Sequence, residues 1–200
     1  MYEKETLNIY FVRHGETKWN TEDRIQGQLD SELTKNGIEE TYLLKKKMSS
    51  LDFSAVYSSE LGRAYKTAKI LTDGNNIKIE KLEELNEKYF GYWQGLEKKE
   101  IFSKYPEQAE NYFNNIEKYN SVEISAESLS DTLNRFIRGV DKIINANKNG
   151  NVLVISHGTI LKLFFNHIDK KDIKDLKEND LMENASYRVL QYYSKKLIRR

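Results

Sequence analysis

Two apolar segments of this chain each end at a His-Gly pair, and this repetition limits the possible folds more than any other feature. Residues 7–12 lead into Arg13-His14-Gly15, and residues 152–156 lead into His157-Gly158. Nearly continuous apolar runs of this length are typical of strands that are buried on both faces of a parallel sheet. Parallel strands bring their carboxyl ends to the same edge of a sheet. We therefore expect both histidines to lie at one edge of the molecule.

Helical patterns separate the strand-like runs. The sequence predicts strands at residues 7–12, 55–58, 152–156 and 187–193, and helices at residues 34–51, 61–71, 128–144 and 158–168. Thr34 is a suitable N-cap for the first of these helices, although Gly37 weakens its first turn. Ser128 and Asp131 form a capping-box pattern at the start of the longest helix. The alternation predicts an α/β fold, a three-layer sandwich in which a largely parallel sheet has helices on both faces.

Residues 96–126 interrupt this pattern. Tyrosines are scattered there among polar residues, and the segment contains the only proline, Pro106. It lacks the Gly, Pro and Ser bias of a flexible linker. We expect a partly helical excursion that forms a small cap over the active site, within a single domain of residues 1–200.

The composition excludes several classes of protein. The formal net charge is +1, so no overall field attracts nucleic acid or an anionic membrane. No apolar run approaches the roughly 20 residues that span a bilayer, and the first five residues show no apolar signal core. The absence of cysteine excludes disulfide bonds and thiolate metal sites and fits a reducing compartment, so we expect a cytoplasmic protein. No pattern indicates an oligomeric state.

Arg13 and His14 form a combination suited to phosphoryl transfer. A neutral imidazole is a good nucleophile, and a guanidinium binds phosphoryl oxygens through paired, charge-assisted hydrogen bonds. Arg63 falls in the first turn of a helix that follows a predicted strand, on the side of the sheet where ligands bind. His157 precedes a helix whose free N–H groups favour an anion. These residues predict a phosphohistidine site, whereas His167 matches no motif and is interpreted as a surface or helix C-terminal residue.

Further motifs follow in a fixed order between about residue 9 and about residue 160. They are Arg13-His14-Gly15-Glu16-Thr17-Lys18-Trp19-Asn20, Arg24-Ile25-Gln26-Gly27, Leu33-Thr34, Gly37, residues 58–68, residues 85–95, Glu127-Ser128 and His157-Gly158. Together they resemble the histidine phosphatase superfamily, also called the phosphoglycerate mutase-like family. A series of blocks in the family's order is far more specific than a lone three-residue motif.

The resemblance implies a role for each matching residue. His14 is the implied nucleophile, which becomes phosphorylated, and Glu87 is the implied proton donor. The implied phosphate site consists of Arg13, Arg63, His157 and Asn20 and the backbone of Gln26, Gly27 and Gly158, with Thr17 near its rim. His14 needs a free nitrogen facing phosphorus, which a hydrogen bond on its other nitrogen would enforce. No metal and no other cofactor is implied, because cationic side chains supply the charge.

The implied activity is that of a metal-independent phosphomonoesterase of the histidine acid phosphatase type, acting on a small phosphorylated metabolite. No arginine occurs between Arg63 and Arg135, where the mutases of the family place arginines that hold a second acidic group. Phe90 and Thr159 replace a tyrosine and an asparagine of those mutases. Two alternatives stay open: a cofactor-dependent phosphoglycerate mutase and a catalytically silent phosphate-binding module.

The leaving-group pocket is the part of the site that the sequence defines least. We expect residues 96–126 to form it together with Trp19, Ile25 and Tyr89. The absence of an arginine cluster disfavours polyanionic substrates. Cations for a second acidic group could still come from the lysines of the region, Lys98, Lys99, Lys104 and Lys118. The identity of the substrate stays open.

Overall fold

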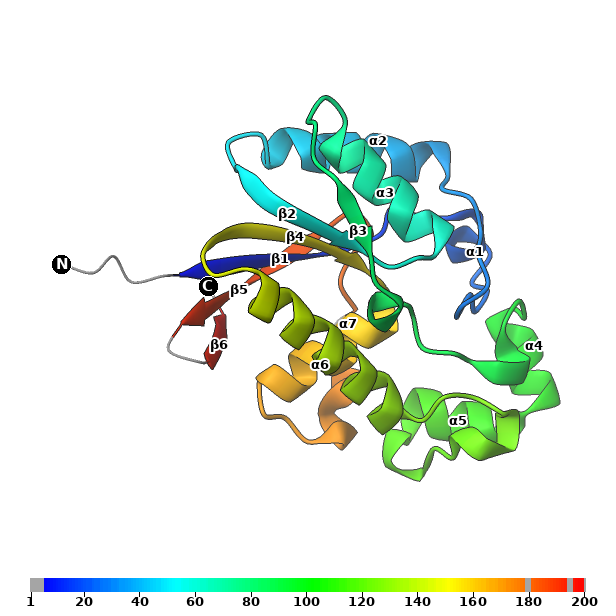
Figure 1. The fold of residues 1–200 in the computed structure, drawn as a ribbon. Helices are drawn as coiled ribbons and strands as arrows, with labels where there is room; N and C mark the ends of the chain where they lie inside the picture. Colours follow the sequence, from blue (N-terminus) through cyan, green and yellow to red (C-terminus); the bar gives the residue numbers. More distant parts are fainter. Residues whose placement is uncertain (1–5, 179–180, 194–195, 200) are drawn as a thin grey trace.

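A six-stranded sheet forms the centre of the molecule (Figure 1). The computed structural model describes residues 6–178, 181–193 and 196–199. The strands are β1 (Leu7–Arg13), β2 (Phe53–Ser58), β3 (Ile79–Lys81), β4 (Gly150–Ser156), β5 (Tyr187–Tyr193) and β6 (Lys196–Arg199). Their order across the sheet is β3-β2-β4-β1-β5-β6. The first four strands in this order are parallel, β5 pairs antiparallel with β1, and β6 pairs antiparallel with β5.

Helices cover both faces of the sheet. In Figure 1, α2 (Lys35–Lys47) and α3 (Gly62–Thr72) lie above the sheet, and α6 (Leu129–Ala146) and α7 (Gly158–Ile168) lie below it. The other helical elements are α1 (Lys18–Thr21), α4 (Lys98–Lys104), α5 (Pro106–Asn114) and the 3-10 turns η1 (Glu83–Leu85), η2 (Gly91–Trp93), η3 (Ile116–Lys118), η4 (Ser121–Ile124) and η5 (Ile173–Glu178). The predicted three-layer α/β fold is confirmed.

Alternating side chains of the central strands build two separate cores. Ile9 and Phe11 of β1 pack toward α6 and α7, whereas Tyr10 and Val12 pack toward α2 and α3. Full burial of a large apolar side chain stabilises the fold by about 1.5–3 kcal/mol relative to exposure. Because β1 is buried on both faces, nearly every position in it is apolar, and this explains the continuous run in the sequence.

Gly37 allows α2 to approach the loop that follows β1. A Cβ atom at Gly37 would lie 2.2 Å from the carbonyl oxygen of Glu16. Thr34 caps α2 by accepting a hydrogen bond from the Gly37 N–H, and its hydroxyl donates to the Glu16 carboxylate at 2.6 Å. The glycine that weakens the first turn of α2 is therefore a requirement of packing.

Residues 96–126, called the cap segment below, have an apolar cluster of their own. The segment contains α4, α5, η3 and η4. Trp93 is fully buried in this cluster, where its ring stacks on Phe113 and meets Tyr112 edge-on. Figure 1 shows α4 and α5 apart from the sheet, at the end to which the carboxyl ends of β1 and β4 point.

The predicted elements agree with the structure apart from their ends and some short segments. The helix predicted at 34–51 ends at Lys47, with Met48 as its C-cap. Ser128 caps α6, but the Asp131 carboxylate accepts from the Ser128 hydroxyl and not from its N–H, so the capping box is not reciprocal. β3, β6 and α1 are too short to produce a periodic pattern. The first five residues lie outside the described ranges, and no helix within those ranges is long and apolar enough to cross a bilayer.

Candidate active site

The carboxyl ends of β1, β2 and β4 meet at one edge of the sheet. Arg13 is the last residue of β1 and is followed by His14, and His157 directly follows β4. β1 and β4 are neighbours, and their register pairs Arg13 with Ser156. The ring centroids of His14 and His157 are 5.1 Å apart. The expectation that both histidines share one edge is confirmed.

His14 carries its proton on one ring nitrogen and a lone pair on the other. Its Nδ1 lies 2.8 Å from the carbonyl oxygen of Gly15, to which only an N–H group can donate. Its Nε2 accepts a hydrogen bond from Arg63 Nε at 3.3 Å. The Gly15 N–H donates to Thr67 Oγ1 at 3.0 Å and so fixes the loop. His14 therefore has its proton on Nδ1 and its lone pair on Nε2, where Arg63 donates to it.

Burial keeps both histidines neutral. It lowers the pKa of His14 well below its ordinary value of 6.5, and the guanidinium groups of Arg63 and Arg13 lower this pKa further. Burial likewise lowers the pKa of His157 well below 6.5, with the same two arginines contributing. Each ring is therefore neutral at neutral pH, with one N–H group and one nitrogen lone pair.

Arg63 is held rigidly by acceptors from the loop between α1 and α2. Its Nη2 donates to the carbonyl oxygen of Gly27 at 2.7 Å, and its Nη1 donates to that of Leu29 at 2.7 Å. Asp30 accepts from Nη1 at 3.0 Å and from the Arg63 backbone N–H at 3.2 Å. Because the guanidinium is planar, these contacts also fix the direction in which Nε points, which is toward His14.

Arg13 has a protein partner for one of its donor groups and keeps a second donor for a ligand. Its Nη1 donates to the carbonyl oxygen of Met182 at 2.5 Å, whereas its buried Nε has no partner among the described residues. Burial lowers the pKa of Arg13 to about 10, which leaves the side chain charged at neutral pH. Gly158 makes room for this group, since a Cβ there would lie 3.2 Å from Arg13 Nε. A buried, unsatisfied cationic donor is suited to an anionic oxygen.

His157 is oriented by a serine that follows β2. The Ser59 hydroxyl donates to Asn86 Oδ1 at 2.7 Å, so it accepts from His157 Nε2, which lies 2.7 Å away. His157 Nδ1 is buried and has no partner within the described part of the chain. His157 therefore has its proton on Nε2 and an unsatisfied nitrogen on the side away from Ser59.

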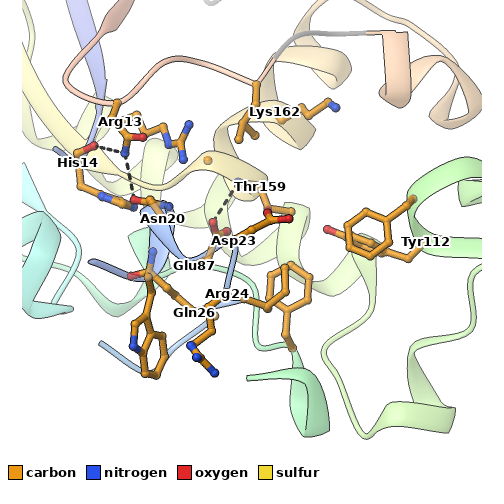
Figure 2. Close-up of a pocket in the computed structure, with 18 of the residues that line it drawn as sticks. Arg13, His14, Asn20, Asp23, Arg24, Gln26, Glu87, Tyr112, Thr159 and Lys162 are labelled. Atoms are coloured by element: carbon orange, nitrogen blue, oxygen red, sulfur yellow. Dashed lines mark hydrogen bonds between the residues drawn. The ribbon is translucent and has the colours of Figure 1, made fainter. Parts of the chain in front are cut away.

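The Glu87 carboxylate lies at the N-terminus of α7. Its Oε2 accepts from the Thr159 N–H at 3.0 Å (Figure 2), and its Oε1 accepts from the N–H groups of Ile160 at 3.0 Å and Lys88 at 2.9 Å. A helix N-terminus favours negative charge. The three hydrogen bonds fix the carboxylate at the polar end of the site.

Arg135 of α6 holds the loop that carries Glu87. Its guanidinium donates to the carbonyl oxygens of Glu84 at 3.0 Å, Asn86 at 2.8 Å and Glu87 at 3.2 Å. It also pairs with the Glu127 carboxylate at 2.9 Å. Arg135 thus positions the loop by holding its carbonyl oxygens, and it does not line the cavity described below.

Asn20 turns its amide nitrogen toward the site because its oxygen is already used. Asn20 Oδ1 accepts from the backbone N–H of Thr17 at 3.1 Å and from its hydroxyl at 3.0 Å, and Asn184 Nδ2 lies 3.4 Å away. Gln26 Nε2 donates to the Thr17 hydroxyl at 2.8 Å. The expectation that Thr17 lies near the rim is wrong. Thr17 is fully buried, because it caps α1 and orients Asn20 and Gln26.

A cavity of about 460 Å³ opens onto this edge of the sheet. At its polar end it is lined by Arg13, His14, Asn20, Gln26, Gly27, Arg63, Glu87 and Gly158. The structure thus brings together eight of the ten predicted site residues at the cavity. Thr17 and His157 lie behind this wall.

The outer part of the cavity has an apolar wall. It is formed by Trp19, Ile25, Phe90, Tyr112, Phe113, Ile116, Leu176 and Leu181, and Figure 2 shows Tyr112 across the cavity from His14. The charged groups there are Asp23, Arg24, Lys162 and Lys177. Tyr89 does not line the cavity, contrary to expectation, because its side chain turns outward and is 41% exposed.

The family model of the histidine phosphatase superfamily (branch 1) matches residues 9–198. The chain belongs to this superfamily. It is 32% identical to a metal-independent phosphoserine phosphatase of Arabidopsis thaliana, over 82% of this chain and 69% of that one. It is 33% identical to a 2,3-bisphosphoglycerate-dependent phosphoglycerate mutase of Cytophaga hutchinsonii, over 94% of this chain and 88% of that one. Among solved structures, Bacillus stearothermophilus YhfR has a TM-score of 0.92 at 29% identity, covering 96% of this chain and 95% of that one.

The relatives of this histidine phosphatase superfamily member include both phosphatases and mutases, so membership alone does not distinguish hydrolysis from isomerisation. The choice depends on the residues that surround the leaving group. No group of three or more His, Cys, Asp or Glu side chains in the described ranges is placed to hold a metal ion.

Sequence reasoning missed several residues that position the site of this superfamily member. Asn184 donates to the carbonyl oxygen of His14 at 2.9 Å, from the segment that precedes β5. Asp30 fixes Arg63, Ser59 orients His157, and Arg135 holds the loop that carries Glu87. Ser59 and Asp30 lie inside or beside recognised motifs, so their positions carried a signal. Asn184 and Arg135 lie in no quoted motif, and only the folded chain brings them to the site.

Proposed function

We propose that the protein is a metal-independent phosphomonoesterase of the histidine acid phosphatase type, which acts on a small phosphorylated metabolite. The reaction proceeds through a phosphohistidine at His14. The neutral, oriented ring of His14 and the unsatisfied donor of Arg13 support this proposal. The absence of cysteine supports a cytoplasmic location.

In the first step, His14 Nε2 attacks phosphorus and the ester P–O bond breaks. Arg13 and Arg63 stabilise the negative charge on the phosphoryl oxygens, with the Asn20 amide as a further donor. For this step Glu87 must be in its protonated form; it gives the proton to the leaving oxygen, so an alcohol departs in place of an alkoxide.

In the second step, water attacks the phosphohistidine and the P–N bond breaks. Glu87, now ionised, accepts a proton from that water. His14 regains its Nε2 lone pair, and inorganic phosphate leaves. The cycle needs no other reactant.

The apolar outer wall is the observation that favours hydrolysis over the mutase reaction. A mutase must hold a second acidic group while the phosphoryl group is transferred. Arg24 at this wall is already paired with Glu22 at 3.0 Å and Glu97 at 3.2 Å. The lysines considered for this task, Lys98, Lys99, Lys104 and Lys118, do not line the cavity. Only Lys162 and Lys177 contribute further cations in the described ranges, and lysine lacks the bidentate fork of arginine.

The test is phosphate release from a panel of phosphomonoesters in the presence of a metal chelator. His14→Ala should abolish turnover, and Glu87→Gln should slow it most for esters with poor leaving groups, because these depend on protonation. Matched controls are His167→Ala and Glu83→Gln, which change exposed residues of the same types. Acid-labile phosphate on His14 after a rapid quench would identify the intermediate.

Two outcomes would contradict the proposal. Isomerisation of a phosphoglycerate without phosphate release, dependent on a bisphosphorylated primer, would identify a mutase. Folded wild-type protein that binds phosphate but turns over no ester would identify a silent binding module.

A further inference from the structure

Lys88 is a buried cation that the proposed reaction does not use. It directly follows Glu87, is fully buried, and does not line the cavity. Its ammonium group lies 3.3 Å from the carbonyl oxygen of Tyr89 and 3.4 Å from the hydroxyl of Tyr119. No carboxylate of the described residues forms an ion pair with it.

This arrangement is unfavourable for stability. Burial lowers the pKa of Lys88 to about 8, even though the carboxylates of Glu127 and Glu87 act in the opposite direction. Arg135 already pairs with Glu127. A buried charge without a close ionic partner costs free energy, and an apolar side chain of similar size is often more stable in such a place. The reason for a lysine here must lie in what its ammonium group touches.

The ammonium group touches the aromatic wall of the leaving-group pocket from behind. It lies 4.6 Å from the ring centroid of Phe90, a cavity-lining residue, and 5.4 Å from that of Tyr119. Tyr119 packs edge-on against Tyr112 at 4.9 Å, and Tyr112 meets Phe90 at 5.6 Å. A cation over an aromatic ring is attracted to its face. Lys88 thus joins the segment that carries Glu87 to Tyr119 of the cap segment, and Tyr119 packs in turn on Tyr112.

We propose that Lys88 is a positioning residue that holds Phe90 directly, and Tyr112 through Tyr119, in the leaving-group wall, and so sets the preference for esters with a large apolar leaving group. The proposal rests on the proposed function, because it assigns the outer wall to the leaving group. The side chain acts through these rings and does not touch the phosphoryl group.

The experiment compares the binding of 1-naphthylmethylphosphonate and methylphosphonate, which contain no ester bond and need no turnover. Lys88→Met keeps the length of the side chain and removes the charge. We expect it to weaken binding of the naphthyl compound about tenfold and to change binding of methylphosphonate less than twofold. Tyr119→Phe, which removes only the hydroxyl acceptor, should give a smaller loss in the same direction. Lys69→Met is the control, since Lys69 lies 4.9 Å over the ring of Tyr65 in α3, away from the cavity.

A pH series separates this role from a general packing role. The ratio of the two affinities should fall in the wild type as Lys88 loses its proton above about pH 8, and it should stay constant in Lys88→Met. The titratable groups that act on the ammonium are the carboxylates of Glu127 and Glu87 and the Tyr119 phenol, and Arg135 pairs with Glu127. Burial raises the pKa of Tyr119 above its ordinary value, so the phenol stays protonated over this range.

An unchanged affinity ratio in Lys88→Met, or an equal loss for both phosphonates, would overturn the proposal. The proposed function is refuted by a different result. A wild type that prefers the naphthyl phosphonate through Lys88 but hydrolyses no ester would refute the proposed function and leave the role of Lys88 intact.

Discussion

Arg63 donates a hydrogen bond through Nε to His14 Nε2, over 3.3 Å in buried surroundings. The hydrogen bond keeps the proton of His14 off Nε2. In the proposed reaction the same guanidinium moves this donor to a phosphoryl oxygen when the substrate enters. Its remaining nitrogens are tied to Gly27, Leu29 and Asp30 and keep it in place during this exchange.

Arg63→Lys should lower kcat/KM by about 100-fold or more. A lysine cannot contact Gly27, Leu29 and His14 at once, and loss of one preorganised donor to a developing charge typically costs about 10²–10³ in rate. Steady-state kinetics measures the effect. Arg138→Lys, an exposed change on α6, should stay within about twofold of wild type. Comparable activity in the two variants would show that Arg63 is not part of the reaction site.

Acidification below pH 6.5 should destabilise the protein through its two buried histidines. Their pKa values are lowered in the folded state, so the unfolded chain binds protons below pH 6.5 while the folded chain does not. The free energy of unfolding is therefore unaffected by these histidines above pH 6.5. Below pH 6.5 it decreases by about 1.4 kcal/mol per pH unit for each histidine. Urea unfolding at pH 7.5 and 5.5 gives the slope.

The variants His14→Asn and His157→Asn should each make this slope shallower, and His167→Asn, which changes an exposed histidine, is the matched control. Equal slopes in all three variants would mean that the loss of stability arises elsewhere in the chain.

Binding of inorganic phosphate should be accompanied by proton uptake at His157. Ser59 fixes the proton on Nε2, so a phosphate oxygen near Nδ1 meets a lone pair unless that nitrogen gains a proton. Calorimetry in buffers of different ionisation enthalpy counts the protons taken up. Ser59→Ala frees the ring to carry its single proton on Nδ1, and the uptake should then decrease. Equal proton uptake in the wild type and in Ser59→Ala would show that His157 is not the group that gains the proton.

Lys88 should reduce stability most at neutral pH. Its folded-state pKa of about 8 lies below the ordinary 10.5, so the unfolded chain holds the proton more tightly between these values. Above pH 10.5 Lys88 is neutral in both states and its burial carries no penalty from charge. As pH falls from 10.5 to about 8 the free energy of unfolding decreases by up to about 3 kcal/mol. Lys88→Met should remove this dependence and unfold at a higher urea concentration than wild type at pH 7. Lower stability of the variant at pH 7 would show that the charge itself stabilises the cap segment.

Gly37→Ala should destabilise the protein by about 2–4 kcal/mol, although alanine favours helices. The added Cβ would meet the Glu16 backbone, which cannot move without displacing Thr17 and Asn20. Thermal unfolding and activity should both decline. Gly74→Ala is the comparison, because nothing lies within 4 Å of its Cβ and only its φ of +82° is unfavourable, at a cost of about 1 kcal/mol. Equal losses in the two variants would point to chain flexibility and not to the clash.

The central strands and their histidines could be predicted because burial leaves a strong pattern. β1 and β4 are apolar at almost every position, and the residue after each strand must emerge at the ligand-binding edge. Arg63 was predictable for the same reason, since it begins the helix that follows β2. These features depend on local sequence and on one rule of parallel sheets.

Other parts depend on contacts that no local pattern records. The sequence predicts Thr17 at the rim of the phosphate site, but its hydroxyl donates to Asn20 and accepts from Gln26 inside the fold. Asn184 reaches the loop of His14 from 170 residues away. Lys88 follows Glu87 with no local sign of burial in the sequence, yet it is fully buried against Tyr119 of the cap segment. In each case the outcome depends on which neighbour the fold supplies.

The pairing of β1 with β4 has a consequence for how the chain acquires its site. Asn8 and Asn151, which bond across these strands, are 143 residues apart in the sequence. Contacts of such separation form slowly, because the loop-closure entropy is lost before they are made. During synthesis, His14 leaves the ribosome long before its partner histidine exists. A nascent chain that lacks β4 should therefore lack a complete site, and activity should appear only when the last quarter of the protein has been made and has joined the sheet.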